Sequence, residues 1–154
     1  MSAGDWCLLE SDPGLFSALI REFGFTGAQV KTCFFFRNSK YKFFLQVDEL
    51  WGLEPDISKP LGKIFGLIFL FKWDGKKETQ SQGTVVNDQD QPGLFFARQV
   101  INNACGTQAL LSVLLNIKDE KTELGETLAN FMDFAGCLDS EMKGKLLCYF
   151  LGTN

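Results

Sequence analysis

The segment from Ala104 to Leu115 constrains the fold more than any other part of the sequence, because it is apolar nearly all round. A helix on a protein surface keeps one polar face toward water, whereas a helix that is apolar on every side has to be covered by other elements. We therefore expect the rest of the chain to enclose this helix, with Asn102 or Asn103 as its N-cap. With 154 residues and a 45% hydrophobic composition, the chain is the size of one globular domain.

Two amphipathic helices are predicted, one before and one after this segment. Asp12 is placed to cap the first helix, Pro13 occupies its first position, and Gly24 ends it. The second helix follows Thr122. The apolar stripe of the first consists of Leu15, Phe16, Leu19, Ile20 and Phe23, and that of the second of Leu124, Leu128, Phe131, Met132 and Ala135. Both stripes repeat at the spacing of a helix that packs on a core.

Residues 64–71, Ile-Phe-Gly-Leu-Ile-Phe-Leu-Phe, form a continuous apolar run rich in β-forming residues. Such a run predicts a strand that is buried on both faces. Residues 75–93 are polar and contain several Gly and Gln, which predicts an exposed loop with one short strand at 84–86. We find no internal repeat and no sign of a second domain.

The composition argues against several kinds of function. The net charge of −4 disfavours nucleic acid as a partner, because phosphate backbones are held by clustered Lys and Arg. The first residues lack the apolar run of a signal peptide, and the eight residues 64–71 are too few to span a bilayer. Five cysteines without CxxC spacing, and no His, predict free thiols and no metal site. We expect an intracellular protein that needs no cofactor and binds no membrane.

Cys105 is the strongest candidate for chemistry. At the start of a helix, unpaired N–H groups and the helix dipole favour a thiolate, which is the attacking species in acyl transfer. On position alone, a cysteine in an apolar segment is more often a small core residue. Gln99 precedes the helix and can fold back to donate to an oxyanion, or it is simply a polar residue on the approach. Gly106 allows close approach of a substrate backbone, or it is a small residue in a crowded core.

The stretch Gln99-Val-Ile-Asn-Asn-Ala-Cys105-Gly-Thr resembles the active-site signature of the ubiquitin C-terminal hydrolases (peptidase family C12), in which Gln and Cys lie six residues apart. Residues 95–99, 6–14 and 19–24 are most similar to the proteasome-associated branch of that family. The matching segments cover residues 1–30 and 47–144, with the same order and spacing throughout.

This resemblance implies an α/β (α+β) fold of papain-like geometry, incomplete here at its C-terminus, in which the nucleophile's helix packs against an antiparallel sheet. It implies a thiol-dependent deubiquitinase of cytoplasm and nucleus that acts in ubiquitin-dependent protein catabolism. Cys105 corresponds to the nucleophile and Gln99 to the oxyanion stabiliser. The family's general-base His and the Asp that orients it come from a later part of the chain and have no counterpart here. Ubiquitin is the implied partner, as is the proteasome in this branch, although the docking extension is missing.

Two segments depart from the family pattern. Residues 31–46 contain five of the sixteen Phe, four basic residues and no acid. We interpret them as a translated intron, the alternatives being an inserted surface loop and a basic aromatic segment that binds a partner or a membrane surface. Residues 145–154 also leave the pattern, and both segments begin with Lys after a codon that can supply a splice donor. We therefore assign residues 1–144, interrupted at 31–46, to the catalytic domain and 145–154 to a non-family tail.

Catalysis by these residues alone is not expected, because no His is present to serve as base and acid near neutral pH. One alternative function is a non-catalytic fragment that binds ubiquitin or another partner. Another is an unrelated papain-type protease, which the spacing of Gln99 and Cys105 alone permits. The match across the first helix and residues 67–73 disfavours the latter.

Overall fold

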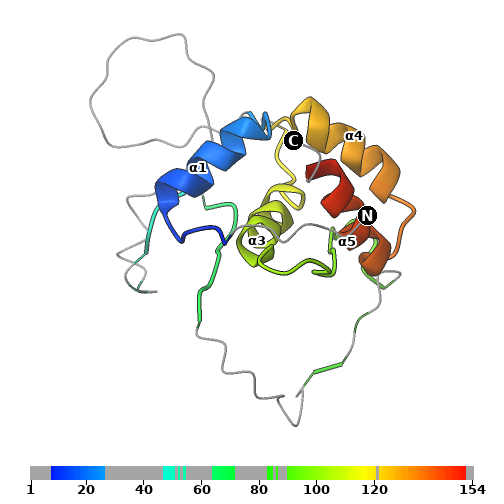
Figure 1. Cartoon of the computed structure of the whole chain (residues 1–154), viewed down its shortest axis with the longest axis horizontal. Coiled ribbons are helices and arrows are strands. Elements are labelled where there is room, and N and C mark those ends of the chain that lie inside the picture. The colour runs from blue at the N-terminus through cyan, green and yellow to red at the C-terminus, as the bar shows by residue number, and fades with distance from the viewer. Residues whose placement is uncertain are drawn as a thin grey trace.

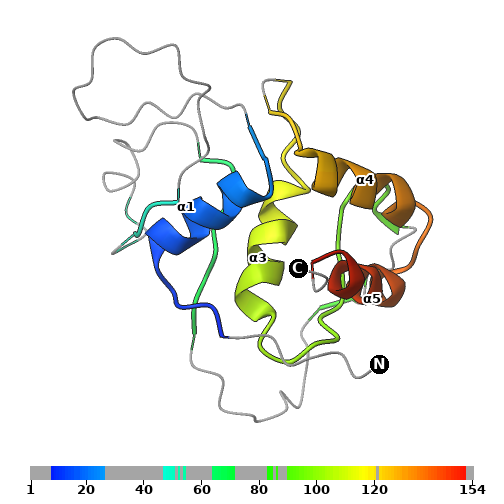
Figure 2. The same cartoon turned by 45° about the horizontal axis from the view of Figure 1, so that its top comes forward.

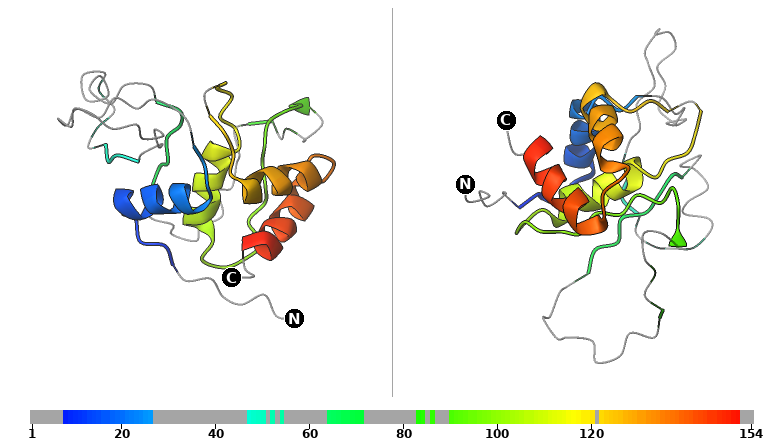
Figure 3. Two further views of the ribbon diagram at one scale, coloured as in Figure 1. Left: turned by 90° about the horizontal axis from the view of Figure 1, so that it is seen from above. Right: turned by 90° about the vertical axis from the view of Figure 1, so that its right-hand side faces the viewer.

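The computed structural model describes residues 8–26, 47–50, 52, 54, 64–71, 83–84, 86, 90–120 and 122–151. Within these ranges the chain forms helices α1 (Pro13–Glu22), α3 (Cys105–Leu114), α4 (Glu126–Ala135) and α5 (Ser140–Leu151). Helix α3 lies between α1 on one side and the pair α4 and α5 on the other (Figures 1 and 2). The same arrangement is visible from above in the left view of Figure 3.

Helix α1 begins and ends where the sequence predicts. The side chain of Asp12 accepts a hydrogen bond from the backbone N–H of Leu15 (2.9 Å), and Pro13 follows in the first turn. Gly24 comes after the last turn with φ of +72°, a left-handed conformation that glycine adopts without strain. The residues of α1 that the fold buries are Phe16, Ser17 and Ile20. The predicted cap, start and end of this helix are confirmed.

Two glycines allow the chain after α1 to meet the chain before α4. Thr26 and Glu123 form an isolated antiparallel bridge, with backbone N–H···O distances of 2.9 and 2.6 Å. A Cβ atom on Gly125 would overlap the carbonyl oxygen of Phe23, and one on Gly24 would lie 3.1 Å from the Cα of Gly125. Residues with a side chain do not fit at this approach, so the two glycines hold α1 close to α4.

The core surrounds α3. Phe131 of α4 stands edge-on to Phe95, with 5.8 Å between ring centroids, and to Phe150 of α5 at 5.7 Å. Each such pair adds about 0.5–1.5 kcal/mol beyond the burial of its area. The buried cluster consists of Phe16, Ile20, Phe25, Phe95, Ala97, Leu110, Leu111, Leu114, Leu115, Leu128, Phe131, Ala135 and Leu147. The prediction that other elements enclose the apolar helix is confirmed, and so is the predicted apolar face of α4.

Residues 64–71 do not form the predicted buried strand. They have no regular structure, and Leu67, Phe69 and Leu70 are 62%, 78% and 63% exposed. Only Phe65 and Ile68 of this run pack against the core. A strand buried on both faces needs neighbours above, below and beside it, and the described residues do not supply them. Thr84 and Val86 of the short strand predicted at 84–86 are also outside any strand, while residue 85 lies outside the described residues.

Helix α5 runs through the boundary that we predicted at residue 144. It continues to Leu151, and Leu147 within the predicted tail is only 5% exposed. Residues 31–46 lie wholly outside the described residues. The assignment of both segments as foreign to the family stays a prediction.

Candidate active site

Cys105 is the first residue of α3, and it is exposed. Among the described residues no side chain caps this end of the helix, since the N-cap is Ala104, whose side chain has no hydrogen-bonding group. The first backbone N–H groups of α3 therefore lack a side-chain acceptor at the positive end of the helix dipole, where an oxyanion is favoured. The prediction that Cys105 begins a helix is confirmed.

The predicted cap of this helix is wrong. Neither Asn102 nor Asn103 is the N-cap, and Asn103 instead has φ of +64°. Asparagine tolerates this left-handed conformation better than most residues with a side chain. The chain needs such a residue to turn sharply before α3, and this backbone requirement replaces the capping role.

Gln99 is exposed in the segment that leads to this turn. Its Nε2 donates a hydrogen bond of 2.9 Å to the carbonyl oxygen of Ile101. A primary amide nitrogen carries two hydrogens, so this bond orients the amide group and leaves a second hydrogen to donate elsewhere. The roles of Gln99 as oxyanion stabiliser and of Cys105 as nucleophile stay predictions.

Gly106 packs closely against the N-terminal segment. A Cβ atom here would lie 3.2 Å from Cδ2 and 3.3 Å from Cβ of Leu9, which is tighter than ordinary contact. Of the two interpretations given to this glycine, the structure therefore supports the packing one. Its small size brings residues 8–10 against the first turn of α3.

Side chains from α3 and its C-terminal end hold the segment that carries Gln99. The N–H of Phe95 donates to Oδ1 of Asn116, and Nδ2 of Asn116 donates back to the carbonyl of Phe95, both at 2.8 Å. Nε2 of Gln108 donates to the carbonyl of Ala97. We did not predict either contact. The available signal was that Gln108 and Asn116 are polar residues in an apolar helical segment, where a buried polar group requires a partner.

Helix α5 holds the same segment from another direction. The backbone N–H of Arg98 donates to the carbonyl of Ser140 at 2.8 Å. A Cβ atom on Gly144 would overlap the carbonyl oxygen of Arg98, so only glycine permits this contact. The backbone before Gln99 is thus fixed between α3 and α5.

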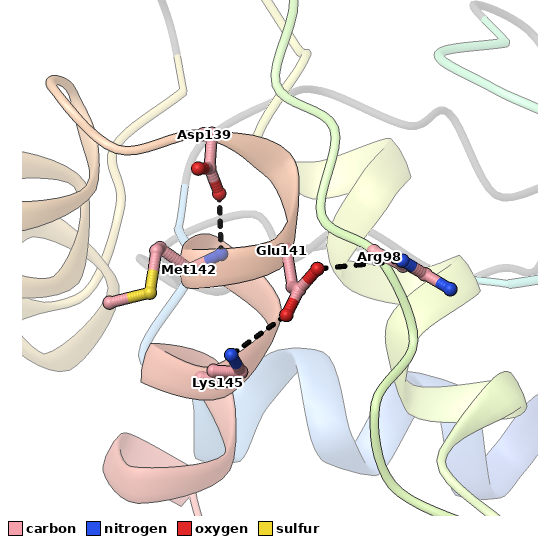
Figure 4. A network of polar contacts seen from close by, with 5 residues as sticks. All are labelled: Arg98, Asp139, Glu141, Met142 and Lys145. Atoms are coloured by element: carbon pink, nitrogen blue, oxygen red, sulfur yellow. Dashed lines mark hydrogen bonds and ion pairs between the residues drawn. The ribbon is translucent and has the colours of Figure 1, made fainter.

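A small ionic network lies over this contact (Figure 4). Glu141 accepts from Nζ of Lys145 at 2.8 Å and from the guanidinium of Arg98 at 3.5 Å. The pKa of Glu141 lies below its ordinary value, chiefly because of the hydrogen bond from Lys145 and then because of the positive charges of Lys145 and Arg98. Asp139 accepts from the N–H of Met142 at 2.8 Å, which caps the first turn of α5.

A groove of about 370 Å³ lies between α1, α3 and residues 64–70. Helix α3 lines it with Leu110, Val113 and Leu114, which belong to its C-terminal half. The groove is therefore at the end of α3 away from Cys105 and is not part of the candidate active site.

The two other cysteines among the described residues differ from Cys105 in their surroundings. Cys137 is exposed near the end of α4, and Cys148 is half-buried in α5, where burial raises the pKa of its thiol. Across the described ranges, no three His, Cys, Asp or Glu side chains gather where they could hold a metal ion. None of the helices found there is long and apolar enough to cross a bilayer.

Comparison with known proteins assigns the chain to a family. The family described as ubiquitin carboxyl-terminal hydrolase, family 1, matches residues 6–149. The chain belongs to this family. Ubiquitin carboxyl-terminal hydrolase 2 of Schizosaccharomyces pombe is 44% identical over 142 residues, which are 92% of this chain and 41% of the relative. The isozyme L5 enzyme of Dictyostelium discoideum is 42% identical over 92% of this chain and 34% of its own length.

A solved structure supports the predicted fold. The catalytic domain of Trichinella spiralis UCH37, bound to ubiquitin vinyl methyl ester, is 39% identical, with a TM-score of 0.71 over 96% of this chain and 59% of that one. The papain-like ubiquitin C-terminal hydrolase fold is thereby confirmed, as is the UCH37 and L5 branch. The chain spans about two fifths of the length of the first curated relative.

Proposed function

We propose that these residues form the nucleophile-bearing part of a thiol-dependent ubiquitin C-terminal hydrolase. The observation that carries the proposal is the exposed Cys105 at the first position of α3, where no side chain of the described residues caps the helix N-terminus. In a chain of this family, that placement suits a thiol that must ionise and meet a substrate carbonyl.

The proposed chemistry is acyl transfer. The Cys105 thiolate attacks the carbonyl carbon of the C-terminal glycine of ubiquitin, and the carbonyl electrons move onto oxygen. The backbone N–H of Cys105 and the side-chain amide of Gln99 donate to that oxyanion. The carbon–nitrogen bond then breaks, the leaving amine takes a proton, and water hydrolyses the resulting thioester to release ubiquitin and the thiol.

The proton transfers require a group that these 154 residues do not contain. A base has to accept the thiol proton and an acid has to return one to the amine, and His commonly serves both roles near pH 7. The sequence has no His. We therefore propose that the chain on its own binds and reacts at Cys105 but does not turn over.

We further propose ubiquitin as the partner, with cytoplasm and nucleus as the compartments. The UCH37 relative is bound to a ubiquitin derivative, which supports the first of these. Association with the proteasome is a proposal that follows from the family branch alone.

The test separates reaction at Cys105 from turnover. Purified chain is incubated with ubiquitin vinyl methyl ester and, separately, with ubiquitin bearing a fluorogenic C-terminal amide. We expect a covalent adduct at Cys105 but no cysteine-dependent turnover, because loss of triad members costs on the order of 10⁴ to 10⁶ in kcat. Cys105→Ala should abolish the adduct, whereas Cys137→Ala removes a second exposed thiol and should leave it intact.

Two results would contradict the proposal. An adduct on Cys137 in place of Cys105 would remove the assigned nucleophile. Cysteine-dependent turnover within about a hundredfold of an intact family member would show that a base exists among these residues. Ubiquitin binding without any adduct would favour a second function, non-catalytic binding of ubiquitin. This alternative is considered because the sequence has no His to act as the base.

A further inference from the structure

A row of polar side chains runs along one side of the largely apolar α3 and just past its end. Gln108, Ser112 and Asn116 are spaced four residues apart, which places them above one another on a helix. The row is internally bonded: the hydroxyl of Ser112 donates to the carbonyl of Gln108 at 2.8 Å, and Nδ2 of Asn116 donates to the carbonyl of Ser112 at 2.7 Å. The side chains at its two ends, Gln108 and Asn116, also bond to the backbone of the segment before Gln99.

These two ends meet the segment before Gln99 in antiparallel order. Asn116 bonds Phe95, and Gln108, about two helical turns nearer the N-terminus of α3, bonds Ala97. Moving forward along the segment therefore means moving back along the helix. Two residues beyond Ala97 is Gln99, which brings it toward the end of α3 where Cys105 lies.

Gln108 links the two candidate site residues more directly than any other contact described here. Its backbone N–H donates to the carbonyl of Ala104 at 2.9 Å and so closes the turn that contains Cys105. Its side chain holds the carbonyl of Ala97, a residue that is 3% exposed, so water has little access to replace the bond. By comparison, the bond from Arg98 to Ser140 ties the segment to α5 and not to the nucleophile's helix.

We propose that Gln108 is a positioning residue, which holds the amide of Gln99 in register with the thiol of Cys105. The inference rests on the proposed function, since it assigns Gln108 a role through the oxyanion donor. Gln108 itself does not touch the substrate in this assignment. It fixes the distance between the segment that carries Gln99 and helix α3, which carries Cys105.

The test uses the full chain and ubiquitin with a C-terminal aldehyde. Addition of the Cys105 thiol to the aldehyde carbon forms a hemithioacetal, in which the sulfur proton ends on the oxygen that Gln99 should contact. No leaving group departs, so the missing base does not prevent the measurement. Capture is quantified at equilibrium for the unsubstituted chain, Gln99→Ala, Gln108→Leu and the double variant.

We expect Gln99→Ala to weaken aldehyde capture by up to about tenfold, because one hydrogen bond to the hemithioacetal oxygen is lost. Gln108→Leu should weaken it by nearly as much, and the double variant should be no weaker than Gln99→Ala, because both changes remove one interaction. The rate of Cys105 alkylation by iodoacetamide, which needs no oxyanion donor, should stay unchanged. Ser112→Ala serves as the matched control, because among the described residues its hydroxyl bonds to the carbonyl of Gln108 within the same helix.

The possible failures are distinguishable. No Cys105-dependent capture by the unsubstituted chain would overturn the proposed function and this inference with it. Capture that falls in Gln99→Ala but not in Gln108→Leu, or effects that multiply in the double variant, would overturn the inference alone. If circular dichroism shows that Gln108→Leu is unfolded, Gln108→Glu is used to test the role of Gln108 in its place. Its capture relative to the unsubstituted chain should recover as the pH falls, because the protonated carboxyl can donate to Ala97 and the neighbouring buried carbonyl raises the pKa of this carboxyl. A ratio independent of pH would overturn the inference.

Discussion

Residues 64–71 have no polar side chain, whereas helix α3 has three, yet α3 is the segment that the fold buries. In α3, Leu110, Leu111 and Leu114 are at most 2% exposed. In residues 64–71, Phe69 is 78% and Phe71 is 69% exposed. Hydrophobic composition alone therefore does not determine which segment enters the core.

The difference lies in how each segment satisfies its backbone. A helix pairs its N–H and C=O groups internally, so α3 needs only side chains around it. A strand pairs its backbone with neighbouring strands, and a segment such as 64–71 becomes a buried strand only where such neighbours exist. The described residues provide the cover that α3 needs but not the strands that 64–71 needs.

The sharpest test of this comparison removes one large aromatic side chain from each region. Phe131→Ala deletes a ring that is 1% exposed and contacts both Phe95 and Phe150. We expect it to lower the free energy of unfolding by about 3–5 kcal/mol. Phe69→Ala deletes an exposed ring that, among the described rings, stacks only on Phe71. It should change the free energy of unfolding by less than about 0.5 kcal/mol. Urea unfolding followed by circular dichroism measures both, and equal losses would refute the contrast.

A second prediction concerns close backbone contact in the packed region. Helix propensity alone would make Gly144→Ala stabilising by about 1 kcal/mol. Because the new Cβ would overlap the carbonyl oxygen of Arg98, we expect a net loss of about 1–3 kcal/mol in the free energy of unfolding.

The matched control is Gly136→Ala at the end of α4. That glycine has helical dihedral angles, and the nearest atom to an added Cβ is 3.7 Å away. We expect a gain of about 0.4–1 kcal/mol. If both variants are stabilising, the contact between α5 and the backbone of Arg98 is not as close as in the structure.

The smallest expected effect comes from the exposed network at the start of α5. Because Lys145 and Arg98 lower the pKa of Glu141 in the folded chain, its contribution is present above the ordinary carboxyl pKa and is lost as pH falls through the lowered one. Glu141→Gln should therefore be destabilising at pH 7, with a loss that shrinks toward acid pH and at high salt.

Glu126→Gln serves as the comparison for that prediction. Glu126 also lies in the first turn of its helix, so both substitutions remove the same favourable interaction with the helix dipole. The difference between the two pH profiles of unfolding isolates the ion pairs of Glu141. Identical profiles would mean that the two ion pairs of Glu141 drawn in Figure 4 contribute nothing to stability.

The sequence by itself determined the features whose causes lie within one or two turns of chain. Asp12, Pro13 and Gly24 set the limits of α1, and the apolar spacing after Thr122 placed α4. The motif from Gln99 to Cys105 indicated the family and the start of α3. Local sequence was not sufficient for the turn before α3, where the conformation of Asn103 displaced the expected cap.

Only the tertiary structure decided how these elements meet. The bonds from Gln108 to Ala97 and from Asn116 to Phe95 join residues 11 and 21 positions apart, and Gly106 and Gly144 matter because of what packs on them. The apolar pattern of residues 64–71 likewise did not predict that most of them are exposed. The physical reason is the same in each case: a residue's own conformational preference acts over one turn, whereas burial and hydrogen-bond satisfaction depend on atoms that the fold brings from elsewhere.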